Sequence, residues 1–187
     1  MKNFLLLMSI WFCSITMYGQ KDLSIVGIPL GISAKEFDSQ LIQKGFKNLD
    51  GGDTKIYKGE FIGETVLLAT LEIDNRILRA MVTFEAKESW NAVLSQYKQI
   101  KSLFLKKYGE CQHVSEEKLD EFYTEYPTFI LMGLKKGDLR YGTYFKTETG
   151  YIAINISSSE GTEGNIKLTY DHNDLSAQRE KRNLDDI

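Results

Sequence analysis

Cysteine and histidine are scarce in this chain, which excludes several classes of protein. One of its two cysteines, Cys13, lies in the first twenty residues, so Cys111 has no partner for an intramolecular disulfide once these are removed. The two histidines, His113 and His172, are far apart in the sequence, and neither stretch supplies a recognisable set of zinc ligands. We therefore expect no disulfide, no metal site and no cofactor, and stability that comes from an ordinary hydrophobic core.

Catalytic motifs are also missing. The chain has no GxSxG elbow, no phosphate-binding loop and no HExxH motif. Cys111 and His113 are the only neighbouring nucleophile and base, and nothing around them resembles a cysteine-nucleophile signature. The acidic stretch at residues 116–125 and the turn at residues 50–53 lack the ligand pattern of a calcium loop. The sequence therefore predicts a protein that is not an enzyme.

A dense basic patch, which nucleic-acid binding requires, is absent as well. The formal net charge is −3, and removal of an N-terminal signal would take away Lys2 and no acidic residue. The lysine pairs at residues 106–107 and 135–136 are too short to follow a phosphate backbone. Nucleic acid is excluded as a partner.

The N-terminal apolar run is too short to cross a bilayer. Residues 4–15 are apolar and follow Lys2, whereas a membrane span needs about 20 such residues. The bulky residues before Cys13 do not fit a lipoprotein signal, and Gly19 is a small residue at a suitable cleavage site. We predict that residues 1–19 are a signal peptide, and that the protein is exported to the periplasm or the cell exterior with no membrane span after cleavage.

Two segments carry helix signals at both ends. In GISAKEFDSQLIQKGF, residues 31–46, Ser33 and Glu36 have the spacing of a capping box, and Gly45 can end the helix in a left-handed conformation. A second helix is predicted from Ser89 to Gly109, with apolar residues at helical spacing. The side chains expected to pack in the core are Phe37, Leu41, Phe46, Trp90, Leu94, Tyr97 and Phe104.

Each predicted helix is followed by strands. They are expected at residues 54–58, 65–73 and 77–84 after the first helix, and at 139–146, 151–157 and 165–170 after the second. The sequence predicts an α+β fold made of two tandem helix-plus-antiparallel-sheet units, at about residues 26–86 and 87–171. Without a Pro/Gly/Ser-rich linker between the units, residues 20–171 are expected to form a single domain, followed by a charged, disordered tail at residues 172–187.

The order of helices and strands, and two stretches of the sequence, resemble those of known proteins. The stretch GIPLGISAKEFDSQLIQKGFK, with YKGEFIGETV downstream, is similar to a family of uncharacterised exported proteins of Gram-negative bacteria. The duplicated helix-plus-sheet order resembles the architecture of the β-lactamase inhibitor protein, and outer-membrane assembly lipoproteins carry a single such unit. The resemblance spans about residues 26–171 and rests on caps, strand starts and turns, so it implies a fold and no activity. No inhibitory loop can be matched residue by residue.

Aromatic residues in the second unit suggest a binding surface. Tyr141 and Tyr144 have opposite parity on one predicted strand, so one of them should point away from the core. We predict that the side of the second sheet facing away from its helix, with the insert at residues 110–126, forms a contact surface. Its residues are Tyr123, Tyr126, Tyr141, Tyr144, Glu117 and Glu121. An acidic rim of this kind would favour a basic partner.

The sequence favours one class of function and leaves two others open. We expect a non-enzymatic exported binding module that recognises a protein or a cell-envelope component. A hydrolase of an envelope or nutrient polymer would need paired carboxylates lining a cleft. A carrier of a small apolar ligand would need a cavity between helix and sheet.

Overall fold

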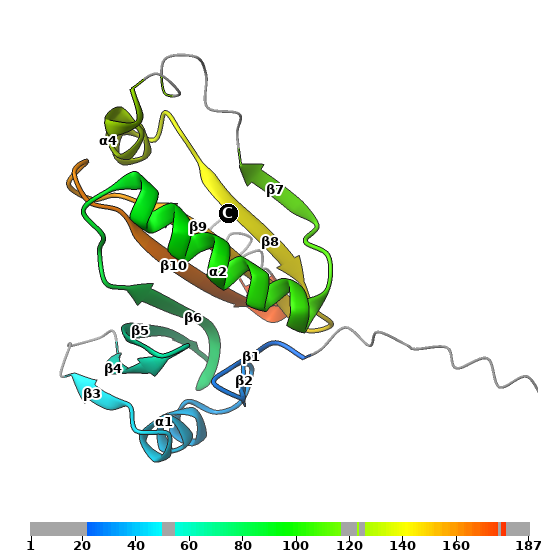
Figure 1. The fold of residues 1–187 in the computed structure, drawn as a ribbon. Helices are drawn as coiled ribbons and strands as arrows, with labels where there is room; N and C mark the ends of the chain where they lie inside the picture. The colour runs from blue at the N-terminus through cyan, green and yellow to red at the C-terminus, as the bar shows by residue number, and fades with distance from the viewer. Residues whose placement is uncertain (1–21, 50–54, 117–122, 124–125, 176, 179–187) are drawn as a thin grey trace, which may run out of the picture.

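A large antiparallel sheet is the centre of the fold (Figure 1). The structure is a computed structural model that describes residues 22–49, 55–116, 123, 126–175 and 177–178. The eight strands of the large sheet have the order β3-β4-β5-β6-β10-β9-β8-β7. They are β3 (Lys47–Leu49), β4 (Ile56–Phe61), β5 (Glu64–Ile73), β6 (Arg76–Phe84), β7 (His113–Glu116), β8 (Tyr141–Lys146), β9 (Gly150–Ser157) and β10 (Asn165–His172). A separate small hairpin is made of β1 (Ser24–Ile25) and β2 (Ile28–Pro29).

The helices flank this sheet as the α+β prediction requires. They are α1 (Ala34–Gln43), α2 (Trp90–Tyr108), α4 (Ile130–Lys136) and the 3-10 helix η1 (Pro127–Phe129). Each predicted strand is present, although β4 continues through Gly59 to Phe61 instead of ending at the glycine. The short strands β1, β2, β3 and β7 were not predicted, because segments of two to four residues are too short for periodicity to be seen.

The strand order joins the two halves of the chain in one sheet. After α1 the strands β3 to β6 form a meander, and after α2 the strands β7 to β10 form another. The last strands of the two meanders, β6 and β10, pair antiparallel, with Thr83 opposite Lys167 and Ala80 opposite Tyr170. Because these two strands are hydrogen-bonded neighbours, the halves share a continuous core.

The ends of α1 follow the sequence signals closely. The Ser33 hydroxyl accepts a hydrogen bond from the Glu36 amide at 3.3 Å, which is one half of a capping box. At the other end Gly45 has φ +88°, and the Phe46 amide donates to the Leu41 carbonyl at 3.1 Å. This Schellman arrangement turns Phe46 back into the core, where it is buried.

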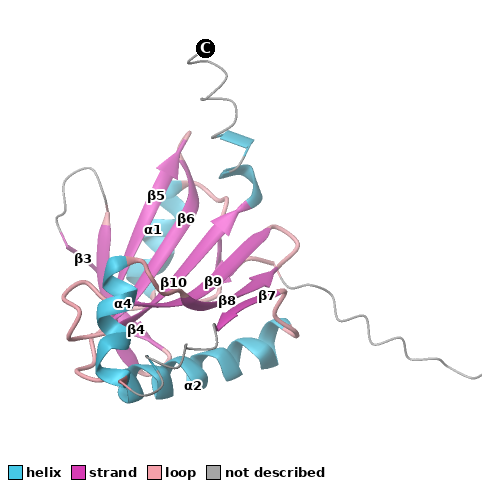
Figure 2. Cartoon of the chain, turned by 90° about the horizontal axis from the view of Figure 1, so that it is seen from above, coloured by secondary structure: helices cyan, strands magenta, loops and turns pink. Residues whose placement is uncertain are grey.

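Both long helices cover the same face of the sheet (Figure 2). Tyr57 on β4, Leu68 on β5 and Val82 on β6 lie opposite one another in the strand register and are fully buried. The Tyr57 hydroxyl donates a hydrogen bond to Asp38 of α1, which places α1 over this face. In the other half Phe104 of α2 packs on Phe145 of β8, in the same layer of side chains.

One predicted core residue lies nearer the surface than expected. Phe37, Leu41, Phe46, Trp90, Tyr97 and Phe104 are buried, as predicted. Leu94 is only half-buried and packs against the margin of the core, whereas its neighbour Val93 is fully buried. The buried stripe of α2 passes through Val93, Tyr97 and Ile100, so Leu94 falls beside it.

The predicted C-terminal tail begins later than the sequence suggested. His172 is the last residue of β10, residues 173–175 are helical, and Leu175 is buried. Asp174 accepts a hydrogen bond from Arg76 at 2.8 Å and forms an ion pair with it. The boundary at residue 171 is therefore wrong for residues 172–175, because one apolar residue and one ion pair anchor them. Residues 179–187 lie outside the described residues.

A β-branched residue stands in a turn position that normally takes glycine or asparagine. Ile62 and Gly63 connect β4 to β5 with φ +56° and +76°, the signature of a type I′ turn. A branched side chain in the left-handed region is strained. Replacing Ile62 by asparagine should therefore raise the free energy of unfolding by about 1 kcal/mol, measured by urea denaturation.

The matched control is Leu49→Asn. Leu49 is as exposed as Ile62, at 41% against 40%, but lies in an extended strand. It loses a similar apolar group and relieves no backbone strain, so no stabilisation is expected. Equal effects of the two substitutions would contradict the strain at Ile62.

Candidate binding surface

The sheet side turned away from α1 and α2 is here named the outer face. Side chains alternate along a strand, so the strand registers decide which residues belong to it. Its central residues are Lys58 on β4, Leu67, Ala69 and Leu71 on β5, Arg79, Met81 and Thr83 on β6, Lys167, Thr169 and Asp171 on β10, Tyr151, Ala153 and Asn155 on β9, and Gly142, Tyr144 and Lys146 on β8.

Large apolar and aromatic side chains on the outer face are exposed. The exposed fractions are 45% for Leu67, 37% for Leu71, 39% for Met81, 39% for Tyr144 and 47% for Tyr151. Each belongs to a strand whose alternate residues are buried under the helices. The outer face is therefore solvent-accessible over β5, β6, β8 and β9.

The parity prediction for the two tyrosines of β8 is confirmed. Tyr144 is on the outer face, and Tyr141 points the other way, toward α2. The Tyr141 ring lies edge-on to Trp90 at 5.1 Å and to Tyr97 at 5.3 Å between centroids. Burial, and then the charge of Glu116, raise the pKa of Tyr141. Tyr141 is therefore part of the core margin and does not belong to the predicted contact surface.

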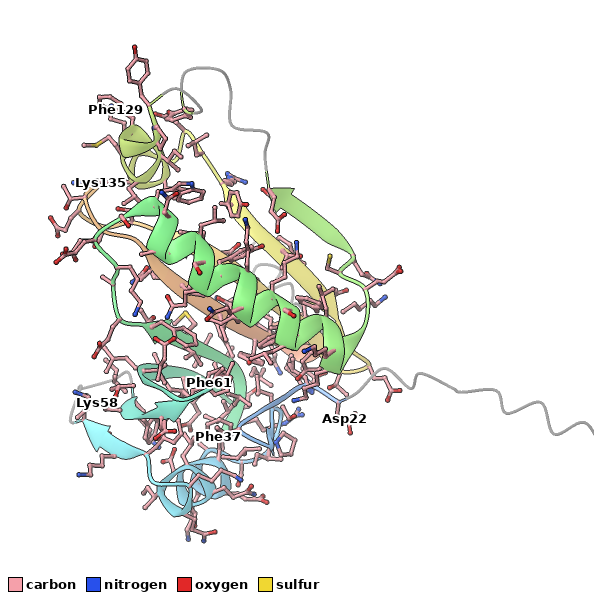
Figure 3. The ribbon with its side chains drawn as sticks, viewed as in Figure 1. Asp22, Phe37, Lys58, Phe61, Phe129 and Lys135 are labelled. Carbon is pink, nitrogen blue, oxygen red and sulfur yellow. The ribbon has the colours of Figure 1, made fainter. Side chains whose placement is uncertain are left out.

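The remaining predicted site residues do not join Tyr144. Tyr126 is 45% exposed, and its ring lies 6.4 Å from that of Phe129, which projects from one end of the molecule (Figure 3). Tyr123 is half-buried, with its hydroxyl close to Gly133 of α4. Glu117 and Glu121 lie outside the described residues. The predicted set is thus divided between the outer face, the core margin and the η1 segment.

Glu116 does not contribute an acidic rim to the outer face. It lies on β7 opposite Tyr141, with its side chain on the helix side of the sheet. There its carboxylate accepts hydrogen bonds from the Tyr97 hydroxyl, at 3.0 Å, and from the Lys101 ammonium group. Its charge therefore fixes α2 to the edge of the sheet.

An open hollow of about 470 Å³ lies where the outer face meets the start of β8. Tyr144, Asn155 and Ser157 line it from the sheet, and Arg140, which directly precedes β8, lines it as well. Gly142 of β8 lies opposite Asn155, and a Cβ atom there would lie 2.0 Å from the Asn155 amide oxygen. No Asp or Glu is among the described residues that line the hollow.

A bidentate ion pair crosses the centre of the outer face. Arg79 of β6 and Asp171 of β10 lie opposite each other, and the Nη2 atom donates to Oδ2 at 2.7 Å while Nε donates to Oδ1. The side chains are only 23% and 32% exposed, so the pair neutralises itself between the two halves of the sheet. Such fork geometry orients both side chains and stiffens the junction between β6 and β10.

The outer face contains residues that the sequence prediction did not include. Leu67, Leu71 and Met81 come from the first half of the chain, where apolar residues occupy both parities of β5 and β6. A strand that is apolar at both parities can be read as fully buried. The exposed fractions of Leu67, Leu71 and Met81, with no helix of the described residues covering them, show that one side of it is exposed.

Neither a metal site nor a membrane-spanning helix occurs in the parts of the chain that the structure describes. Within them, no group of three or more His, Cys, Asp or Glu side chains could hold a metal ion. None of the helices described there is long and apolar enough to cross a membrane. The predicted signal peptide, residues 1–19, lies outside them.

The chain was compared with protein-family models, with curated proteins and with solved structures, and none of them matches it significantly. Function is therefore inferred from the surface itself.

Proposed function

We propose that this protein is a non-enzymatic exported binding module that holds a protein or cell-envelope component on the outer face. The observation that carries the proposal is the exposure of five large apolar or aromatic side chains on one side of a sheet. An antiparallel sheet with one solvated face normally alternates apolar-in with polar-out. Exposed apolar side chains gathered on one face are typical of an interaction site.

The outer face is large enough for a specific contact. Five neighbouring strands, β5, β6, β10, β9 and β8, span about 24 Å at 4.8 Å a strand, and eight residues extend about 26 Å. The plan area of roughly 600 Å² approaches the 800 Å² that each partner buries in a standard interface.

The strand order supports a duplicated architecture similar to that of the β-lactamase inhibitor protein. Each half has a long helix followed by four strands in meander order, with η1 and α4 inserted between β7 and β8 in the second half, and the two last strands meet antiparallel at the centre. We infer that the two halves are related units, and that the chain belongs with the exported Gram-negative proteins that it resembles. Export itself is supported by the N-terminal sequence alone.

The alternatives receive less support from the geometry. A hydrolase would need two carboxylates facing each other across a cleft, and the hollow beside Tyr144 is lined by Arg140, Asn155 and Ser157 instead. A carrier would need space between helix and sheet, where Phe104 packs on Phe145 and Tyr170. The observations favour recognition on the outer face.

Removing the two outer-face tyrosines tests the proposal. The double substitution Tyr144→Ala/Tyr151→Ala should weaken retention of envelope components on the immobilised protein by about 10-fold or more, since aromatic anchors carry much of an interface's energy. The melting temperature should change little, because both side chains lie outside the core. Quantitative mass spectrometry of the retained fraction measures the effect.

Tyr126→Ala is the matched control. Tyr126 is as exposed as Tyr151, at 45% against 47%, but lies beside η1 and away from the outer face. Its replacement should leave retention unchanged. Loss of retention in this variant, with normal retention in the double variant, would move the binding surface away from the sheet.

A further inference from the structure

The outer face carries a charge of the opposite sign to that of the whole chain. Lys58, Lys146 and Lys167 are exposed on it, and none of their three ammonium groups makes a hydrogen bond or an ion pair with a described residue. Asp171 is neutralised by Arg79, and the remaining acids, Glu60 and Glu85, stand at the margin. A basic surface thus lies on a chain of net charge −3.

The strand register spaces these cations across the sheet. Lys58 and Lys167 lie in one row, separated by β5 and β6, which corresponds to about 14 Å. Arg140, which lines the hollow, adds a guanidinium group that also has no partner among the described residues. Between the cations lie apolar side chains, with Leu67 next to Lys58 and Tyr151 next to Lys146.

We propose that the outer face binds an acidic protein surface whose carboxylates pair with Lys58, Lys146, Lys167 and Arg140. The inference rests on the proposed function and adds the chemistry of the partner. It differs in sign from the basic partner expected from the sequence, because Lys58, Lys146 and Lys167 are exposed on the outer face. Glu116 faces α2, where Tyr97 and Lys101 engage its carboxylate. The other predicted rim residues, Glu117 and Glu121, lie outside the described residues.

The aliphatic residues of the face favour a protein over other polyanions. Leu67, Leu71 and Met81 offer no hydrogen bonds to a glycan, and they suit the apolar side chains at the centre of a protein interface. The cations of the outer face are separated from one another by apolar side chains. This spacing is complementary to a partner in which carboxylates alternate with apolar residues. Charge complementarity of this kind raises the association rate and suppresses basic partners.

The test begins with a phage-displayed library of random short peptides selected on the immobilised mature chain. Enriched peptides should combine Asp or Glu with aromatic or aliphatic residues. One enriched peptide is then synthesised, and its binding is measured by surface plasmon resonance against the wild type and the variant Lys58→Glu/Lys146→Glu/Lys167→Glu. We expect the association rate to fall by about 10- to 100-fold in the variant, and the salt dependence to flatten.

A variant with the same change in net charge is the control. Lys35, Lys98 and Lys106 are exposed on α1 and α2, on the opposite side of the sheet. Replacing all three by glutamate should change the association rate by less than about 3-fold, because the sheet lies between them and the outer face, and charges separated by more than about 8 Å are largely screened at physiological salt. Circular dichroism verifies that both variants are folded.

Three results would overturn the proposal. If basic or neutral peptides are enriched and their binding still requires Tyr144 and Tyr151, the outer face remains the binding site, but the proposal of an acidic partner is refuted. Tighter binding of heparin, or of vesicles containing phosphatidylglycerol, than of any selected peptide would assign the cations to a glycan or a lipid. Binding of acidic peptides that neither the lysine nor the tyrosine substitutions affect would refute the outer face as the site, and with it the proposed function.

Discussion

Replacing Phe104 by alanine is expected to lower the free energy of unfolding by about 3–5 kcal/mol. Phe104 is 5% exposed and lies at the centre of an aromatic cluster between α2 and the sheet. Its ring centroid is 5.6 Å from that of Tyr108, 5.8 Å from Phe145 and 6.5 Å from Tyr170. Truncation removes these contacts and leaves a cavity that rigid strands on one side and a long helix on the other cannot close.

The neighbouring residue supplies the control for this prediction. Leu103 is 44% exposed on the solvent side of α2, so Leu103→Ala should lower the free energy of unfolding by less than about 0.5 kcal/mol. Guanidinium denaturation of both variants measures the difference. A cost below about 1 kcal/mol for Phe104→Ala would mean that the buried side of α2 is assigned wrongly.

Stability is expected to fall steeply above pH 10, where free tyrosine ionises. Burial raises the pKa of Tyr57, Tyr97 and Tyr170 in the folded protein, and the carboxylates of Asp38 and Glu116 add to this for the first two. The folded state therefore keeps these three protons where the unfolded chain releases them, and the pKa of Tyr141 is raised in the same direction. The contribution that these protonated hydroxyls make to the free energy of unfolding is fully present below pH 10. It is lost as the pH rises toward the pKa values of the folded state.

The size of this effect follows from linkage. Each retained proton costs about 1.4 kcal/mol per pH unit, so three tyrosines give a slope of about 4 kcal/mol per pH unit above pH 10. Thermal melts between pH 8 and 12 should reveal it, and absorbance at 295 nm should show these tyrosines ionising only as the protein unfolds. Tyr170→Phe removes one titrating hydroxyl and should make the slope shallower by about 1.4 kcal/mol per pH unit. An unchanged melting temperature up to pH 12 would contradict the burial of these hydroxyls.

These predictions separate the two sides of the sheet. Side chains on the helix side determine stability, as Phe104, Tyr57 and Tyr97 illustrate. Outer-face side chains such as Tyr151 and Lys167 leave the helix-side core untouched when they are replaced. Binding and stability can therefore be measured independently in this protein, and the controls above depend on that separation.

The sequence by itself located the two long helices and six of the eight strands of the large sheet. Ser33, Ser89, Gly45 and Gly109 end the two long helices where the sequence signals predicted, because capping depends on residues only a few positions apart. The turn at Asp74 and Asn75, with φ +50° and +59°, follows from the same kind of local preference. Alternation of Ile152, Ile154 and Ile156 likewise located β9 and its buried side.

Only the tertiary structure decided which residues of different elements lie on the same side of the sheet. The pairing of β6 with β10 is a contact between distant segments, and no local pattern specifies it. That pairing places Leu67 and Met81 on the same surface as Tyr144 and Tyr151, and Lys58 on the same surface as Lys167. A second pairing, that of β7 with β8, turns Glu116 toward α2, because Glu116 lies opposite Tyr141. The acidic partner proposed here follows from this arrangement, because the sign of a surface depends on which side chains the fold brings together.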